Sequence, residues 1–324
     1  MSFSGCSKAG IQYYTKFLRR WIAPSENLCS TARSHCMTAG RTVADSIKFS
    51  NGFHDLPLSI FLLDDLSQHP KSRMVKLYSE ISGKGFRKMR LYFIRHAQSE
   101  NNALYERTGS ENGRSDDARL SELGKVQAQH LAEFIMNGFD PTEKSNGKGF
   151  AFTHIYCSPM YRAIATGTYI SQALGQPLKV WKDWHECGGM YLTNPITGKK
   201  EPRPGITLTQ VREWFPELLT EGYIKEDGWW NRPFEEDGER DVRARRVLKE
   251  LLSRHGGTDD CVAVVSHAGF YVHFLTAVMG LESLRPLWFR MHNAGISRFD
   301  FETENTVLVF HNFVSYLPPD LRSV

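Results

Sequence analysis

The sequence is organised around one stretch, Leu91-Tyr-Phe-Ile-Arg-His-Ala-Gln-Ser-Glu-Asn-Asn102, in which a short apolar run ends in Arg95 and His96 and then turns polar. The apolar run predicts a buried strand. In an open α/β sheet, ligands bind outside the carboxyl ends of the strands. The pair is therefore predicted to bring a cation and a nucleophile to a binding site, with an ordinary solvated turn as the alternative.

Two further segments end in the same way. Residues 261–266 form an apolar run that terminates at His267, and residues 152–157 lead through Ser158 into a helix that carries Arg162 in its first turn. A helix N-terminus offers unpaired N–H groups and the positive end of the helix dipole, which favours a bound anion. Two histidines and two arginines are thus expected to converge on one edge of one sheet.

As an ordered set, these motifs resemble the first branch of the histidine phosphatase superfamily, also called phosphoglycerate mutase-like. The resemblance covers residues 90 to about 313 and rests on Arg95-His96-Ala97, Asn102, Asp117-Ala-Arg-Leu-Ser-Glu-Leu-Gly124 with Gln127-Ala128, Ser158 to Arg162-Ala163, Ser266-His267-Ala268-Gly269 and Asn293-Ala-Gly-Ile-Ser297. It implies a three-layer α/β/α fold with a mostly parallel sheet.

The resemblance also implies a reaction. His96 would attack a phosphoryl group in line, and water would hydrolyse the resulting phosphohistidine without a metal ion or other cofactor. An unperturbed imidazole, with a pKa of about 6.5, is already neutral enough to act as a nucleophile at neutral pH. Arg95, Arg162 and His267 are assigned to hold the phosphoryl oxygens, because phosphoryl transfer depends on positioning and charge stabilisation.

The leaving oxygen needs a proton, and Glu186 is the best candidate donor. Burial beside Trp181 and Trp184 would disfavour its charged form and keep the carboxyl group protonated. The commonest family pattern has its glycine four residues after the glutamate, whereas this chain has Gly188 and Gly189. Rival acids in the same turn are Asp183 and His185.

Two residues of the loop after the first strand complete the candidate site. Asn102 matches the family position that reaches toward the phosphate or orients the nucleophile, and Ser99 is a candidate donor to a phosphoryl oxygen. The alternative for both residues is local capping of the chain after the strand.

Elsewhere the pattern alternates between strands and helices, which predicts a mostly parallel sheet covered on both faces. Predicted strands are 91–95, 152–157, one near 178, 261–266, 295–302 and 306–312, and predicted helices are 121–137, 160–174, about 208–215, 236–254 and 268–279.

Residues 190–238 interrupt this alternation and are expected to form a small cap over the phosphate pocket, as an insertion does at this place in the family. Its cations could meet a second anionic group of the substrate, and its tryptophans could stack on a ring. We favour the alternative of solvated cations and packing tryptophans. The residues in question are Lys199, Lys200, Arg203, Trp229 and Trp230.

Composition sets the outer limits. The chain has 324 residues, of which 41% are hydrophobic, and its formal charge of +4 is small for this length, so nucleic acid is not an expected partner. The six cysteines show no metal-binding spacing and predict reduced thiols in an intracellular protein, with Cys157 and Cys261 as core residues. No apolar run approaches the roughly 18 residues of a membrane span.

An N-terminal extension, residues 1–88, precedes the domain predicted over 89–324. Residues 1–44 contain six lysines or arginines and the single acid Glu26, with apolar residues at helical spacing. The protein is expected to be cytoplasmic, and the alternative is a mitochondrial or other organelle presequence in residues 1–44. The same residues could also form a membrane-surface helix, a helix docked on the domain or an unstructured leader. Two more helices are predicted around Asp64 and over 74–81.

Three functions are compatible with these residues. A phosphomonoesterase acting on a phosphorylated small molecule or a phosphoprotein is favoured, because the extended glutamate motif of the mutases is absent around Glu186. The alternatives are a cofactor-dependent mutase-type phosphotransferase and an inactive module that only binds phosphate. The residues favour no particular oligomeric state.

Overall fold

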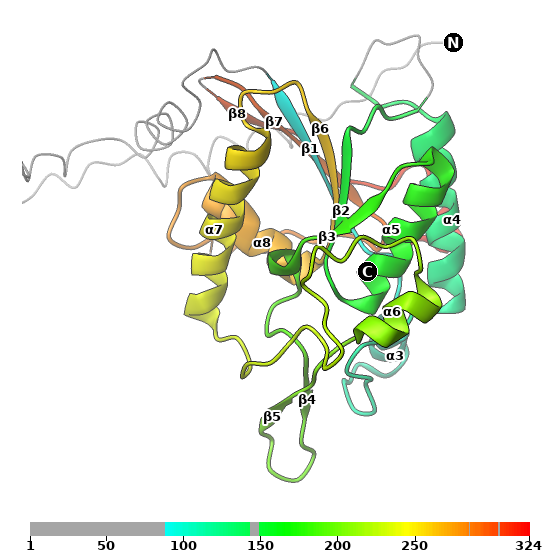
Figure 1. The fold of residues 1–324 in the computed structure, drawn as a ribbon, viewed down its shortest axis with the longest axis vertical. Helices are drawn as coiled ribbons and strands as arrows, with labels where there is room; N and C mark the ends of the chain where they lie inside the picture. The colour runs from blue at the N-terminus through cyan, green and yellow to red at the C-terminus, as the bar shows by residue number, and fades with distance from the viewer. Residues whose placement is uncertain (1–87, 143–148, 285, 304) are drawn as a thin grey trace, which may run out of the picture. The chain divides into compact units, whose positions relative to one another are not determined.

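A six-stranded sheet forms the centre of the computed structural model, which describes residues 88–142, 149–284, 286–303 and 305–324. The strand order is β3-β2-β6-β1-β7-β8 (Figure 1). The strands are β1 (Met89–Arg95), β2 (His154–Cys157), β3 (Leu178–Val180), β6 (Cys261–Ser266), β7 (Ile296–Phe301) and β8 (Thr306–Phe313).

The sheet is mostly parallel, as predicted. Strands β3, β2, β6 and β1 are parallel neighbours, whereas β7 runs antiparallel to both β1 and β8. Strand β1 lies between β6 and β7, with Arg95 opposite Ser266 in the parallel register. The carboxyl ends of β1, β2 and β6 therefore reach the same edge of the sheet, where the sequence places its candidate site residues.

Helices cover both faces of the sheet, and successive side chains of β1 pack into different layers. Tyr92 and Ile94 join the core formed with α4 (Glu122–Asn137) and α5 (Tyr161–Leu174). Leu91 and Phe93 join the core formed with α7 (Asp237–His255) and α8 (Ala268–Val278). Figure 1 shows the two helix pairs on opposite sides of the strands. A strand buried on both faces needs the continuous apolar run that the sequence shows.

The remaining elements surround the carboxyl edge of the sheet. They are α3 (Glu100–Thr108), the 3-10 turn η1 (Lys182–Trp184), the hairpin β4 (Tyr191–Thr193) and β5 (Lys200–Pro202), α6 (Leu208–Trp214) and a second 3-10 turn η2 (Pro319–Leu321). Helix α6 was predicted, whereas α3 and the hairpin were not. The hairpin extends away from the central sheet in Figure 1.

Several sequence predictions concern residues outside this description. They include the leader over 1–44, the two helices before residue 88, Cys6, Cys29 and Cys36. Within the described ranges, Cys157 and Cys261 are buried core residues, as predicted, and Cys187 is also a free thiol. In those same ranges, no helix has the length and apolar character needed to cross a membrane.

Gly124 fixes the loop that follows β1 against the start of α4. A Cβ atom at this position would lie 1.9 Å from the carbonyl oxygen of Gln98, which also accepts a hydrogen bond from the N–H of Ser121 (3.0 Å). Only glycine allows the helix to approach the loop this closely. The family motif that ends at Gly124 therefore places this loop, and with it the residues that follow His96.

Gly124→Ala is expected to lower the free energy of unfolding by about 1–3 kcal/mol, because helix or loop must move to admit the methyl group. Gly238→Ala is the matched control, since its Cβ would meet nothing within 4 Å on α7. Urea denaturation of both variants measures the difference. Equal midpoints would contradict this account of the contact.

Candidate active site

The predicted convergence is present at the carboxyl edge of the sheet. Arg95 ends β1, His96 follows it, Arg162 lies in the first turn of α5, and His267 follows β6. Arg95, His96 and Arg162 line a cavity of about 680 Å³, together with Glu186 from the turn after η1. Residues separated by up to 172 positions, from Arg95 to His267, thus meet at one place.

The hydrogen bonds of His96 define its tautomer. Its Nδ1–H donates to the carbonyl oxygen of Ala97 (2.7 Å), so Nε2 carries the lone pair and accepts from Nε–H of Arg162 (3.1 Å). Burial, together with the positive charges of Arg162 and Arg95, holds the pKa of His96 well below its ordinary value. The imidazole is therefore neutral at neutral pH, with its unprotonated nitrogen turned toward the arginine.

His267 is completely buried beside His96, with the two ring centroids 5.0 Å apart. Its Nε2 lies 2.8 Å from the hydroxyl oxygen of Ser158, whereas its Nδ1 has no hydrogen-bond partner among the described residues. Burial and the nearby charge of Arg162 lower its pKa well below the ordinary value. His267 does not line the cavity itself, and its ring packs beside the ring of His96.

The two arginines are buried cations. Arg95 donates from Nη1 to the carbonyl oxygen of Met291, and its Nε is buried with no partner among the described residues. Burial lowers the pKa of Arg95 to about 10, although the carboxylate of Glu186 opposes this effect. Arg95 is still protonated at neutral pH, and a cation at the wall of a cavity favours an anionic ligand.

Glu186 is held by backbone N–H groups. Those of Cys187, Gly269 and Phe270 donate to its carboxylate at 2.8, 3.2 and 2.9 Å, and the last two belong to the first turn of α8. A Cβ atom on Gly269 would lie 2.5 Å from Oε1 of Glu186, so glycine permits this approach. The helix N-terminus thus orients the carboxylate at the wall of the cavity.

The predicted packing of Trp181 and Trp184 around the carboxylate of Glu186 was wrong, because both rings lie in the core. Trp181 packs on Tyr156, and Trp184 packs on Phe93, Phe270 and Phe274. These aromatic side chains fill the layer under α7 and α8, so they support the turn that carries Glu186 and leave its oxygens to backbone donors.

The two rival acids have other partners. Asp183 pairs with Arg246 of α7 (2.9 Å), and His185 donates from Nδ1 to the carbonyl oxygen of Glu186 (2.8 Å) while its ring packs on Trp229 and Trp230. Burial lowers the pKa of His185 well below its ordinary value. Among the three candidates, only Glu186 lines the cavity.

A buried ion pair that the sequence did not predict holds the turn before Glu186 in place. Arg243 of α7 binds Glu235 through two hydrogen bonds (2.6 and 2.7 Å), and its Nη1 donates to the carbonyl oxygens of Asp183 and His185 (2.7 and 2.9 Å). A guanidinium that satisfies a carboxylate and two carbonyl groups is well suited to a buried position. Arg243 therefore positions the backbone next to Glu186.

Asp117, a motif residue to which no role was assigned, lies behind Arg162. Its Oδ1 accepts from the N–H of Tyr161 at the start of α5 (2.9 Å), and its Oδ2 is buried with no hydrogen-bond partner among the described residues. Burial raises the pKa of Asp117 to about 6, although the positive charge of Arg162 opposes this effect. Asp117 therefore has two roles: it holds the first turn of α5 in place, and it brings a carboxyl group close to Arg162.

Ser99 and Asn102 form the N-terminal cap of α3. The hydroxyl of Ser99 donates to Oδ1 of Asn102 (2.8 Å) and accepts from its N–H (3.2 Å), and Asn102 Oδ1 also accepts from the N–H of Ser99 (3.1 Å) and from Asn293 (3.3 Å). Both residues line the cavity. The capping alternative is therefore present, and Nδ2 is the polar atom of Asn102 left for a ligand.

The region 190–238 shows the packing arrangement that was favoured. Trp229 and Trp230 are buried, whereas Lys199 is exposed and Arg203 pairs with Glu201 (3.2 Å). The ammonium group of Lys200 lies 3.5 Å from the ring centroid of Phe234. Two cations of the cavity were missed, Arg114 and Arg290, and Nη1 of Arg114 contacts Glu111 (3.2 Å) and the hydroxyl of Tyr191 (3.3 Å).

Comparison with known proteins places these residues in a family. The model of the histidine phosphatase superfamily (branch 1) matches residues 91–314. A curated protein of Hydrogenobacter thermophilus, named "Putative phosphoserine phosphatase 2", is 32% identical over 226 residues, which cover 69% of this chain and 95% of that protein. The chain belongs to the histidine phosphatase superfamily. The predicted family, its phosphoglycerate mutase-like fold and the enzyme class, a histidine-type phosphatase, are confirmed.

Two phosphatases of known structure are similar to this histidine phosphatase. A phosphoserine phosphatase from Entamoeba histolytica, in complex with 3-phosphoglyceric acid, is 21% identical with a TM-score of 0.45, and the match covers 71% of this chain and 100% of that one. A mycobacterial glucosyl-3-phosphoglycerate phosphatase is 19% identical with a TM-score of 0.45, over 70% of this chain and 100% of that one.

In this histidine phosphatase, Asp117→Asn is expected to change the pH profile. Above its pKa of about 6 the carboxylate is charged beside Arg162, and the charge is lost as the pH falls below that value. The amide oxygen can still accept from Tyr161, so the helix should stay in place. We expect kcat/KM at pH 7.5 to fall about tenfold, equivalent to about 1.4 kcal/mol, and the acid limb near pH 6 to weaken.

The measurement is kcat/KM between pH 5 and 8 for both proteins with the same phosphate monoester. The second ionisation of the substrate also falls near pH 6, but it affects both proteins equally, so the difference between the two profiles isolates Asp117. Superimposable profiles would contradict this role.

Proposed function

We propose that the protein hydrolyses phosphate monoesters through a phosphohistidine on His96, without a metal ion. The observation that carries this proposal is the unprotonated Nε2 of His96 at a cavity that two buried arginines also line. A neutral, oriented imidazole is ready to act as a nucleophile. Two guanidinium groups beside it suit the charge on the oxygens of a phosphoryl group in transfer.

In the first step, Nε2 of His96 forms a bond to phosphorus while the bond from phosphorus to the ester oxygen breaks. Arg162 exchanges its hydrogen bond with His96 for one to a phosphoryl oxygen, and the guanidinium group of Arg95 donates to another. Glu186 delivers a proton to the leaving oxygen.

In the second step, Glu186 accepts a proton from water, and the water oxygen forms a bond to phosphorus as the bond to Nε2 breaks. The products are inorganic phosphate and the free imidazole. The Nδ2 group of Asn102 is proposed to donate to a phosphoryl oxygen, whereas the hydroxyl of Ser99 is already used in the cap of α3. His267 does not line the cavity, so its proposed role is to hold the ring of His96 in place. The mutase alternative would need the phosphohistidine to be shielded from water and returned to a second acceptor.

The substrate is proposed to be a small phosphorylated organic acid. The curated relative carries the name of a phosphoserine phosphatase, and phosphoserine combines a phosphate with a carboxylate. Arg114, which also contacts Glu111, and Arg290 line the same cavity as His96, and a guanidinium group can bind such a carboxylate through two hydrogen bonds. Residues 190–238 are proposed to form the cap, since Tyr191 also lines the cavity.

The test is phosphate release from phosphoserine, 3-phosphoglycerate and an aryl phosphate, each with and without a strong chelator. We expect turnover of all three, a higher kcat/KM for the two acids, and no effect of the chelator. No phosphate release above background would overturn the hydrolase. Loss of activity on chelation would overturn the metal-free mechanism, and transfer of phosphate between acids without release would favour the mutase.

A further inference from the structure

A second cluster of polar side chains lies at the other end of the same strands. His154 is the first residue of β2, Asp260 directly precedes β6, and His255 is the last residue of α7. The candidate active site lies at the carboxyl ends of these strands. Because β6 has six residues, which corresponds to roughly 20 Å at about 3.3 Å per residue, the cluster is separate from the phosphatase site.

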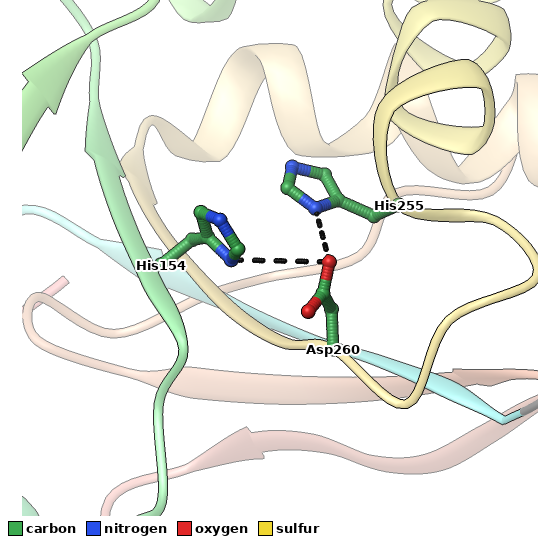
Figure 2. A group of neighbouring side chains, drawn as sticks. All are labelled: His154, His255 and Asp260. Atoms are coloured by element: carbon green, nitrogen blue, oxygen red, sulfur yellow. Dashed lines mark hydrogen bonds and ion pairs between the residues drawn. The ribbon is translucent and has the colours of Figure 1, made fainter.

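The three side chains face one another. One ligand atom from each lies within 4.8 Å of the other two, and both imidazoles turn toward the Asp260 carboxylate in Figure 2. Nδ1 of His255 is 2.8 Å from Oδ2 of Asp260, and Nδ1 of His154 is 3.9 Å from the same oxygen. Donor atoms around a tetrahedral zinc ion lie about 3.3 Å apart, so these two separations bracket the required value.

We propose that His154, His255 and Asp260 form a binding site for a divalent transition-metal cation such as Zn²⁺. Two imidazoles and one carboxylate are a ligand set that zinc accepts, with water in the fourth position. His255 is nearly buried, whereas His154 and Asp260 have 34% and 22% of their side-chain surface exposed. The ion would therefore enter from the solvent side, past His154.

The groups around the cluster suit this role. The hydroxyl of Tyr156 lies 3.2 Å from Nε2 of His255, so it can orient that ring when Nδ1 binds a metal ion and Nε2 carries the proton. The hydroxyl oxygen of Thr153 lies 2.9 Å from Nδ1 of His154 and 3.3 Å from Oδ1 of Asp260. Metal-binding residues generally have such partners on the atom that does not bind the metal, as Tyr156 provides for His255 and Thr153 for Asp260. The contact of Thr153 with Nδ1 of His154 would be exchanged for the bond to the metal ion.

Binding would connect three elements of the fold. The ion would join the start of β2, the end of α7 and the segment that leads into β6. A ligand that binds only the folded state stabilises it. The site is therefore proposed to be structural, with no part in phosphate release.

The experiment is a Zn²⁺ titration of the full chain, stripped of metal, against a chromogenic competing chelator at pH 7.5. His154→Ala is the principal variant because its side chain is partly exposed, and Asp260→Asn is the second. His273→Ala is the matched control, since Nδ1 of His273 pairs with Asp241 (2.6 Å) and belongs to no three-ligand group among the described residues. The number of zinc ions bound by each variant is compared with the number bound by the wild type, so zinc bound elsewhere on the chain cancels.

We expect His154→Ala and Asp260→Asn to bind one zinc ion fewer than the wild type at micromolar zinc, and His273→Ala to bind the same number. Zinc should raise the melting temperature of the wild type and of His273→Ala by more than that of the other two. Phosphate release by His154→Ala without zinc should equal that of the wild type, which shows that the variant is folded. Equal zinc stoichiometry in all four proteins would overturn the site, whatever the fate of the proposed phosphatase activity.

Discussion

His96→Ala is expected to lower kcat for phosphate release by at least about a thousandfold. Loss of a single aimed donor commonly costs a factor of about a hundred to a thousand, and loss of the nucleophile removes the covalent route itself. The measurement is steady-state phosphate release from an aryl phosphate, together with a search for radiolabelled phosphate on the protein after an alkaline quench. The wild type should carry label, and the variant should carry none.

His130→Ala on α4 is the control for this experiment, because His130 does not line the cavity. It should retain wild-type kcat and labelling. His96→Gln tests the same role with a side chain closer in size, so that loss of packing is not mistaken for loss of the nucleophile. If either His96 variant kept substantial turnover, another group would have to be the nucleophile.

Glu186→Gln is expected to have the second largest effect, and the effect should depend on the leaving group. With the amide oxygen in the place of Oε1, the N–H groups of Cys187 and Phe270 can still donate to it, so the turn should stay in place. The amide group cannot deliver a proton, and loss of a general acid typically costs a factor of about 10² to 10⁴. Phosphoserine, whose alkoxide is a poor leaving group, should show this loss in kcat/KM.

4-Nitrophenyl phosphate should behave differently, because nitrophenolate leaves without a proton. Its first step should survive in Glu186→Gln, while hydrolysis of the phosphohistidine becomes slow for lack of a base. Stopped-flow measurement should show a burst of nitrophenolate equal to the enzyme concentration, followed by slow turnover. Asp183→Asn, a change in the same turn that leaves the cavity intact, should show wild-type kinetics with both substrates.

An equal loss for both substrates, without a burst, would contradict the acid and base role of Glu186. A large loss in Asp183→Asn would contradict the choice between these two carboxylates.

Much of the fold could be predicted because its signals are local. The apolar runs at 91–94 and 261–265 each end in a charged or polar residue, and this pattern marks both a buried strand and the edge where it ends. The ends of the long helices were predicted within one residue of the observed positions, because Ser121 and Gly175 mark helix boundaries clearly. The convergence of Arg95, His96, Arg162 and His267 follows from strand order.

The missed features depend on partners that are distant in sequence. Arg243 resembles any other cation on a charged helix until Glu235 and two carbonyl groups surround it. Trp181 and Trp184 are adjacent to Glu186 along the chain, but their rings turn into the core, so sequence proximity misled the explanation of the acid. Helix α3 was missed because Asn102 completes a capping box in which glutamate or glutamine is commoner.

The first turn of α8 positions two of the proposed active-site residues, His267 and Glu186. His267 is its N-cap, and the N–H groups of Gly269 and Phe270 hold Glu186. A displacement of this helix would move both His267, which lies beside the nucleophile, and Glu186. The position of one residue therefore could not be changed without changing the position of the other. To change the substrate range, the first turn of α8 should therefore be kept, and Tyr105, Arg114 and Arg290 should be randomised. These three residues line the cavity and do not belong to that turn.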